Sequence, residues 1–133
     1  MQNKIVLVTG ATSGIGFQTA LALANMGAQV IITGRSHSSG ESAVAEIKAA
    51  SGNSKVDLLT GDLSAQANVR SLAGQFKARY EWLDVLINNA GLAASERKLT
   101  VDKIESNFAV NAVTPFLLTH LLMDSLKAST SPR

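Results

Sequence analysis

The chain has 133 residues, a formal charge of +2 and no cysteine. This length is typical of one domain with a substantial core. The small charge, without a basic run, argues against nucleic-acid binding, and the absence of cysteine excludes disulfides and thiolate metal sites. The longest apolar stretch, residues 116–123, is too short to span a membrane, and a first strand from residue 4 or 5 leaves no room for a signal peptide. We therefore expect one cytoplasmic domain over residues 1–133.

Apolar runs and helical periodicity alternate along the chain. Apolar runs predict strands at 5–8, 29–33, 55–60 and 84–88, and helical spacing predicts helices at 14–26, 41–50, about 65–80 and 102–127. The expected caps are Gly27 and Gly52 at C-termini and Ser39, Ser64 and Asp102 at N-termini. We expect the polar tail, residues 129–133, to be frayed.

This alternation predicts an α/β fold with a four-stranded parallel sheet and helices on both faces. The expected strand order is 3-2-1-4, so that the switch point lies between the first and fourth strands. Ligands bind beyond the carboxyl ends of the strands at such a point. Residues that follow different strands can therefore line one groove although they are far apart in sequence.

The stretch Thr9–Gly16, with the sequence TGATSGIG, lies between the first expected strand and the first expected helix. Gly10 can turn the chain with a positive φ, Gly14 lets the backbone approach a ligand, and Gly16 allows close packing. The free N–H groups of the helix N-terminus then face an anion. The Gly-x-x-x-Gly-x-Gly spacing differs from the common dinucleotide motif Gly-x-Gly-x-x-Gly, and a tight turn without a ligand is the alternative.

Arg35 and Ser36 follow the second strand, where a dinucleotide site selects its cofactor. An acidic residue there binds the ribose 2′-hydroxyl of NAD, whereas an arginine accommodates the 2′-phosphate of NADP. This loop has no carboxylate, and Arg35 offers a forked donor beside the Ser36 hydroxyl. We therefore predict NADP rather than NAD, with a solvated loop arginine as the alternative.

Polar residues also follow the third and fourth strands. Asp62 can accept a hydrogen bond from the adenine amino group, with the Leu63 backbone at the ring edge, or it can serve as a turn or cap residue. Asn88 and Asn89 lie at the switch point, where asparagine tolerates unusual backbone angles and can tie strands together. One of the two asparagines can be purely structural.

Pro115 lies four residues after Asn111 within the last expected helix. Because proline has no N–H, it cannot bond the carbonyl of Asn111, and it tends to kink the helix. That carbonyl is then free to hold a water molecule. The alternative is a kinked packing helix with a buried polar asparagine.

Four motifs occur in order at suitable intervals: Thr9–Gly16, Asp62-Leu63, Asn88–Gly91 and Asn107–Asn111. Together they resemble the amino-terminal half of the short-chain dehydrogenase/reductase family, and residues 100–119 are similar to its retinol-dehydrogenase and WW-domain oxidoreductase branch. The resemblance implies a Rossmann-type fold and hydride transfer between NAD(P) and an alcohol or carbonyl substrate. The predicted cofactor-binding residues are Gly10, Thr12, Ser13, Gly14, Ile15, Gly16, Arg35, Ser36, Asp62, Leu63, Asn88, Asn89, Ala90 and Gly91.

The same resemblance implies that Asn111 is catalytic and that the water on its carbonyl belongs to a proton relay. The family's remaining catalytic residues, a Ser on the fifth strand and a Tyr-x-x-x-Lys pair, are absent, because the sequence stops where that strand would begin. The one tyrosine, Tyr80, is followed four residues later by Asp84, and we expect it to pack at a helix end. Since general acid–base catalysis typically contributes about 10²–10⁴ in rate, we expect the chain alone to be almost inactive.

Without a fifth strand, residues 85–87 form an apolar edge, and such an edge invites pairing with another chain. We therefore expect a homodimer formed through this edge or through the final helix. His37, expected in a loop, and His120, expected on the final helix, form no metal site. A non-catalytic nucleotide-binding or scaffold module is the alternative function. A Rossmann-type methyltransferase is a third, disfavoured by the glycine spacing and by Asn88–Gly91.

Overall fold

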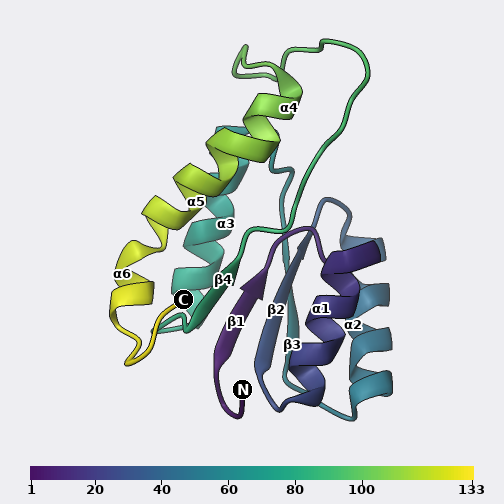
Figure 1. Cartoon of the computed structure of the whole chain (residues 1–133), viewed down its shortest axis with the longest axis vertical. Helices are drawn as coiled ribbons and strands as arrows, with labels where there is room; N and C mark the ends of the chain where they lie inside the picture. The colour runs from purple at the N-terminus through teal and green to yellow at the C-terminus, as the bar shows by residue number, and fades with distance from the viewer.

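The computed structural model describes all 133 residues and contains one parallel sheet in the order β3-β2-β1-β4 (Figure 1). The strands are β1 (Ile5–Val8), β2 (Gln29–Gly34), β3 (Val56–Thr60) and β4 (Val85–Ile87). Helices α1 (Gly14–Asn25) and α2 (His37–Ser51) cover one face, and α3 (Gln66–Arg79) and α5 (Thr114–Leu121) cover the other. The predicted fold class and strand order are confirmed. No helix has the length and apolar character needed to cross a membrane.

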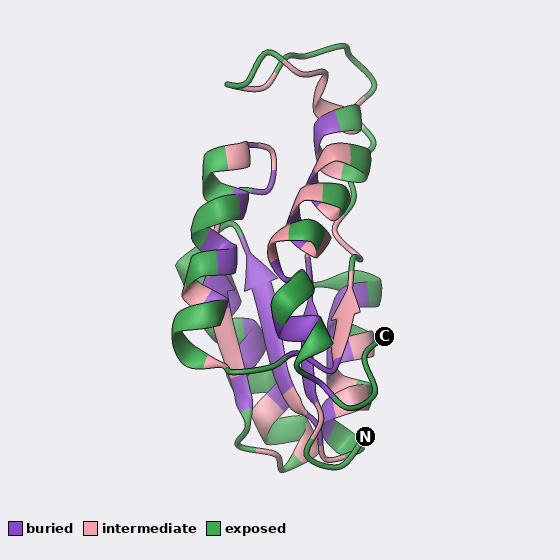
Figure 2. Cartoon of the chain, turned by 90° about the vertical axis from the view of Figure 1, so that its left-hand side faces the viewer, coloured by how far each residue is buried: buried purple, intermediate pink, exposed green.

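The sheet separates two apolar cores, because successive side chains of a strand point to opposite faces. In β1, Ile5 and Leu7 join the core under α3 and α5, while Val6 and Val8 join the core under α1 and α2. All four residues of β1 are buried (Figure 2). Burial on both faces explains why β1 and the centre of β2 are continuous apolar runs rather than alternating patterns.

Two helices are capped by residues other than those predicted. Helix α2 begins at His37, not at residue 41, because the Ser36 side chain caps it by accepting a hydrogen bond from the Ser39 N–H at 3.4 Å. His37 therefore lies in a helix and not in a loop. Helix α3 is not capped by Ser64, since Asp102 accepts a hydrogen bond from its Gln66 N–H at 2.8 Å.

The predicted helix over 102–127 is divided into α4 (Ser106–Phe108), a π-helical segment η1 (Ala109–Val113), α5 and α6 (Met123–Lys127). Glu105, and not Asp102, caps its start by accepting from the N–H groups of Asn107 at 3.0 Å and Phe108 at 2.9 Å. The π-helical turn η1 ends two residues before Pro115. Its wide pitch is seen in the Thr114 N–H, which donates to the carbonyl of Ala109, five residues earlier. A proline clashes with the carbonyl four residues before it, and a π-turn is one way for a helix to make room.

The C-terminal tail is tied to the sheet, so the prediction of a frayed tail was wrong. The Arg133 N–H donates to the Asp84 carbonyl at 2.9 Å, and the Leu86 N–H donates to the Arg133 carbonyl at 3.0 Å. Arg133 thus lies beside β4 in the pattern of a parallel strand. The β4 edge, expected to be bare, is partly paired.

Asp84 links the tail to the amino end of the sheet, where both chain termini lie (Figure 1). The residue is only 3% exposed, and its carboxylate accepts from Lys4 Nζ at 2.9 Å, Ile5 N–H at 2.8 Å, Trp82 Nε1 at 3.1 Å and Ser129 Oγ at 2.6 Å. Burial by itself would raise the pKa of Asp84, but these four donors outweigh it and hold the pKa at about 2.

Candidate cofactor-binding site

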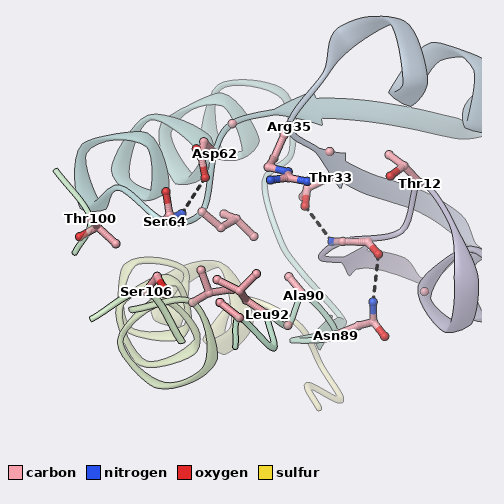
Figure 3. Close-up of a pocket in the computed structure, with 18 of the residues that line it drawn as sticks. Thr12, Thr33, Arg35, Asp62, Ser64, Asn89, Ala90, Leu92, Thr100 and Ser106 are labelled. Carbon is pink, nitrogen blue, oxygen red and sulfur yellow. Dashed lines mark hydrogen bonds between the residues drawn. The ribbon is translucent and has the colours of Figure 1, made fainter. Parts of the chain in front are cut away.

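A cavity of about 700 Å³ opens at the carboxyl ends of the strands, as predicted for the switch point (Figure 3). Its size lies within the range of small-molecule and cofactor sites. Most of the predicted cofactor residues line it: Gly10, Thr12, Ser13, Ile15, Gly16, Arg35, Asp62, Leu63, Asn89, Ala90 and Gly91. Gly14, Ser36, Asn88 and Asn111 are not in the lining.

The β1–α1 turn presents a row of free donors to this cavity. None of the backbone N–H groups of residues 12–16 makes a hydrogen bond, and the N-cap residue Ser13 makes no side-chain cap. Such a helix N-terminus binds anions, because the N–H groups and the positive end of the helix dipole point the same way. The predicted phosphate cradle thus has its donors available.

Two glycines make this turn possible. Gly10 has a φ of +63°, and a Cβ there would lie 2.8 Å from the Cα of Ala90. A Cβ on Gly16 would lie 2.6 Å from the Gly10 carbonyl oxygen and would collide with the Asn89 side chain. Gly10 therefore supplies the predicted positive φ, while Gly16 allows α1 to approach the turn and the Asn89 side chain after β4, rather than the strand before it.

Neighbouring strands hold the turn from both sides. Thr33 of β2 accepts from the Gly10 N–H through Oγ1 at 3.1 Å. The Asn89 amide donates to the carbonyls of Thr9 at 2.9 Å and Gly10 at 3.1 Å, and the buried Thr9 Oγ1 accepts from the Asn89 and Ala90 N–H groups at 3.0 Å. The structural role foreseen for one asparagine of the pair thus belongs to Asn89, which lines the cavity as well.

Arg35 is exposed at the carboxyl end of β2, and its guanidinium forms no hydrogen bond or ion pair (Figure 3). It lines the cavity, so a bound anion can reach its five donors. The Ser36 hydroxyl is committed to the cap of α2. Of the two residues predicted to receive a 2′-phosphate, Arg35 is thus the one that borders the cavity.

Asp62 combines the two roles that its position suggested. One carboxylate oxygen accepts from the Ser64 N–H at 2.9 Å, which closes a turn, and the residue lines the cavity. The Leu63 carbonyl accepts a hydrogen bond from the buried Thr114 hydroxyl at 2.6 Å. Sequence reasoning did not anticipate this contact, because residues 51 positions apart meet only in the tertiary fold.

The segment after β4 completes the cavity with Leu92, Ala94 and residues 98–100, and no recognisable motif covers residues 92–99. Asn88 turns away from the cavity and donates to Thr119 Oγ1 at 3.2 Å. The Asn111 side chain donates to the Leu92 carbonyl at 2.7 Å and accepts from its N–H at 2.8 Å. The proposed water on the Asn111 carbonyl stays a prediction.

Tyr80 lies apart from the cavity at the end of α3. Its hydroxyl donates to Asp57 Oδ2 at 2.8 Å, and its ring contacts Phe76 with centroids 4.9 Å apart. Burial, together with the Asp57 carboxylate, raises the pKa of Tyr80. This is the packing role that the sequence predicted, and it leaves the cavity without a tyrosine from this chain.

The chain is similar to known proteins over nearly its whole length. A family model described as short chain dehydrogenase matches residues 4–132. Human polyprenol dehydrogenase is 42% identical over 98% of this chain and 39% of its own length. Bovine retinol dehydrogenase 12 is 45% identical over 98% of this chain and 41% of its own length. The chain thus spans about two fifths of the length of these curated relatives.

Solved structures share the fold. RhlG of Pseudomonas aeruginosa, solved as an active-site complex with NADP, is 31% identical with a TM-score of 0.84, over 98% of this chain and 51% of that one. A short chain dehydrogenase of Escherichia coli CFT073, complexed with NADPH, is 27% identical with a TM-score of 0.85, over 99% of this chain and 57% of that one. Both complexes hold the form of the dinucleotide that carries a 2′-phosphate.

Proposed function

Because the chain belongs to the short-chain dehydrogenase family, we propose that it is the cofactor-binding portion of an NADP-dependent oxidoreductase. The reaction is hydride transfer between the nicotinamide and an alcohol or carbonyl group. The observation that carries the proposal is that four cavity-lining residues with free backbone N–H groups, Thr12, Ser13, Ile15 and Gly16, share one cavity with the unpaired guanidinium of Arg35. The names of the relatives, polyprenol and retinol dehydrogenases, support an alcohol as substrate.

The free donors of the cavity match the anionic parts of this cofactor. The N-terminus of α1 would hold the pyrophosphate, Arg35 the 2′-phosphate, and Asp62 with the Leu63 backbone the adenine. No acidic residue follows β2, so nothing there offers a carboxylate to the free 2′-hydroxyl of NAD. When bound, the nicotinamide supplies the hydride donor or acceptor.

Substitution of Arg35 tests the cofactor preference. Arg35→Ala is expected to weaken NADP⁺ binding by about 1.5–3 kcal/mol, the scale of a hydrogen bond to a charged group, which corresponds to roughly 10- to 150-fold. NAD⁺ binding should change less than about twofold, because its 2′-hydroxyl carries no charge. Arg70→Ala, at an exposed position of α3, is the matched control. Calorimetric titration of both variants decides, and equal losses for both cofactors would refute the preference.

We propose further that the chain by itself binds NADPH without reducing a carbonyl substrate. Its one tyrosine is bonded to Asp57, so the cavity has no phenol to donate a proton. An assay of NADPH oxidation with ketone substrates tests this, and oxidation in step with ketone reduction would contradict it. The alternative, a non-catalytic nucleotide-binding module, predicts that supplying a carboxyl-terminal partner fragment restores no activity.

We also propose that two copies of the chain associate and that the protein is cytoplasmic. Phe108 on α4 and Phe116 on α5 are 59% and 75% exposed, and such a surface supports pairing of two copies more than the partly paired β4 edge does. Light scattering of the chain and of Phe116→Glu tests the homodimer, which predicts a mass that falls to that of one chain in the variant.

A further inference from the structure

The segment between Gly91 and Arg97 is held in an unusual way. It belongs to no helix or strand and connects β4 to α4 (Figure 1), and its residues Leu92 and Ala94 line the cavity. None of its backbone groups bonds another backbone group. Its only hydrogen bonds come from the side-chain amides of Asn107 and Asn111, which pair with Ala94 and Leu92.

Asn107 binds Ala94 as a neighbouring strand would. Its Oδ1 accepts from the Ala94 N–H at 2.8 Å, and its Nδ2 donates to the Ala94 carbonyl at 3.1 Å. Ala94 lines the cavity, whereas Asn107 does not. The amide therefore acts on the cavity through the backbone that it holds.

Glu105 fixes the orientation of this amide. Its Oε1 accepts from Asn107 Nδ2 at 3.2 Å and from the Asn107 N–H at 3.0 Å. A flipped amide would place Oδ1 against the carboxylate, which is unfavourable, so the donor must face Glu105. The hydrogen bonds from the N–H groups of Asn107 and Phe108 lower the pKa of Glu105, and Arg97 adds to that effect, so the carboxylate stays charged.

We propose that Asn107 is a positioning residue that, oriented by Glu105, holds Ala94 and thereby fixes one wall of the cofactor cavity. The inference rests on the proposed function, because it assigns the wall to a bound dinucleotide. Asn111 supports the same wall at Leu92, but it does not replace Asn107, since each amide bonds a different residue. Loss of the Asn107 amide leaves the backbone of Ala94 without any partner.

Asn107→Asp tests the proposal through its pH dependence. At pH 7.5 the aspartate is ionised, cannot donate to the Ala94 carbonyl, and lies beside the Glu105 carboxylate. Once protonated, it regains one donor and one acceptor in the shape of asparagine, and the neighbouring carboxylate raises the pKa of this step. We expect NADP⁺ to bind the variant roughly tenfold more weakly than the wild type at pH 7.5 and less than about threefold more weakly at pH 5.

Asn107→Leu is the matched control, because leucine has a similar size and no hydrogen-bonding group. It should show the same deficit relative to the wild type at both pH values. Each comparison uses the wild type at the same pH, so titration of the cofactor's own phosphate cancels.

Amide hydrogen exchange at Ala94, measured without cofactor, reads the contact directly. We expect faster exchange in both variants at pH 7.5 and recovered protection only in Asn107→Asp at pH 5, while amides of β1 stay protected and report an intact fold. Unchanged exchange at Ala94, or faster exchange with unchanged NADP⁺ affinity, would overturn the proposal.

If the wild type binds no dinucleotide, the proposed function fails and so does the assigned role, whereas normal wild-type binding with unaffected variants removes only the role of Asn107. If the leucine variant does not fold, the pH response of the aspartate variant still decides.

Discussion

The two ends of the sheet differ in whether their polar groups have hydrogen-bond partners within the chain. At the amino end, the buried Asp84 carboxylate accepts four hydrogen bonds and ties the first strand to the C-terminal tail. At the carboxyl end, the N–H groups of residues 12–16 and the Arg35 guanidinium have no partner within the chain. A buried charge is tolerated only when it is fully paired, whereas unpaired donors beside a cavity remain available to a ligand.

Because of this difference, we expect substitutions at the two ends of the sheet to affect different properties of the chain. The amino end lies outside the cavity, so changes there should affect the free energy of unfolding and leave cofactor affinity alone. The free donors at the carboxyl end should show the reverse, since they make no hydrogen bond within the folded chain. Three substitutions or conditions can test the separation.

The largest effect is expected at Asp84. Asp84→Asn places an amide group among four donors, and breaking a buried pair in this way costs about 3–5 kcal/mol of stability. Urea unfolding measures the loss, with Asp124→Asn at an exposed site of α6 as the control, expected within about 0.5 kcal/mol of the wild type. NADP⁺ affinity of the folded variant should be unchanged, and a parallel loss of affinity would contradict the separation of the two ends.

Acid should remove the contribution of Asp84 in the wild type. The pKa of Asp84 is about 2 in the folded chain against an ordinary value of 3.8, so its ionised form favours the folded state by about 2–2.5 kcal/mol above pH 4. A depressed folded pKa means that this stability is present above the unfolded pKa and is lost as the pH falls from about 4 to 2. Unfolding curves across that range should show the loss in the wild type, and Asp84→Asn should lack this component; an equally steep dependence in both would disprove the assignment.

A smaller effect on binding is expected at Gly16, where the collision with backbone also lowers stability. Gly16→Ala places a Cβ against the Gly10 carbonyl and the Asn89 amide, which displaces the cradle, and we expect NADP⁺ affinity to fall about 30-fold, or about 2 kcal/mol. Gly74→Ala is the control, because a Cβ at this exposed position of α3 meets nothing within 4 Å. The control should bind normally and gain up to about 1 kcal/mol of stability from helix propensity. Equal binding by both variants would show that the turn does not hold the phosphates.

The cofactor side of the cavity could be predicted where a motif follows a strand. The glycine turn, Arg35, Asp62 and Asn89 all reached the cavity, because parallel strands bring their carboxyl ends to one edge. Ser36 and Asn88 follow strands as well, yet they bond Ser39 and Thr119 instead. The local sequence did not reveal those partners, since serine and asparagine serve as caps and ligands alike.

The last third of the chain was predicted least well. Helical spacing indicated one helix over 102–127, but the structure divides it, with a π-turn before Pro115 and Glu105 as its cap. Asp102 and Ser129, expected as a cap and as part of a loose tail, bond Gln66 and Asp84 instead. These contacts join distant positions, so neither periodicity nor cap patterns could identify them.

The sequence by itself determined the order of the elements, the parallel sheet and the phosphate turn, because apolar runs, helical periods and glycine positions act over a few neighbouring residues. Only the tertiary structure decided which polar groups are paired. In the fold, the carboxylate of Asp84 accepts four hydrogen bonds, and the guanidinium of Arg35 stays unpaired at the cavity. The backbone of Ala94 pairs with the side-chain amide of Asn107. The physical reason is that a hydrogen bond forms only within about 3 Å, and side chains far apart along the chain reach that distance only through the fold.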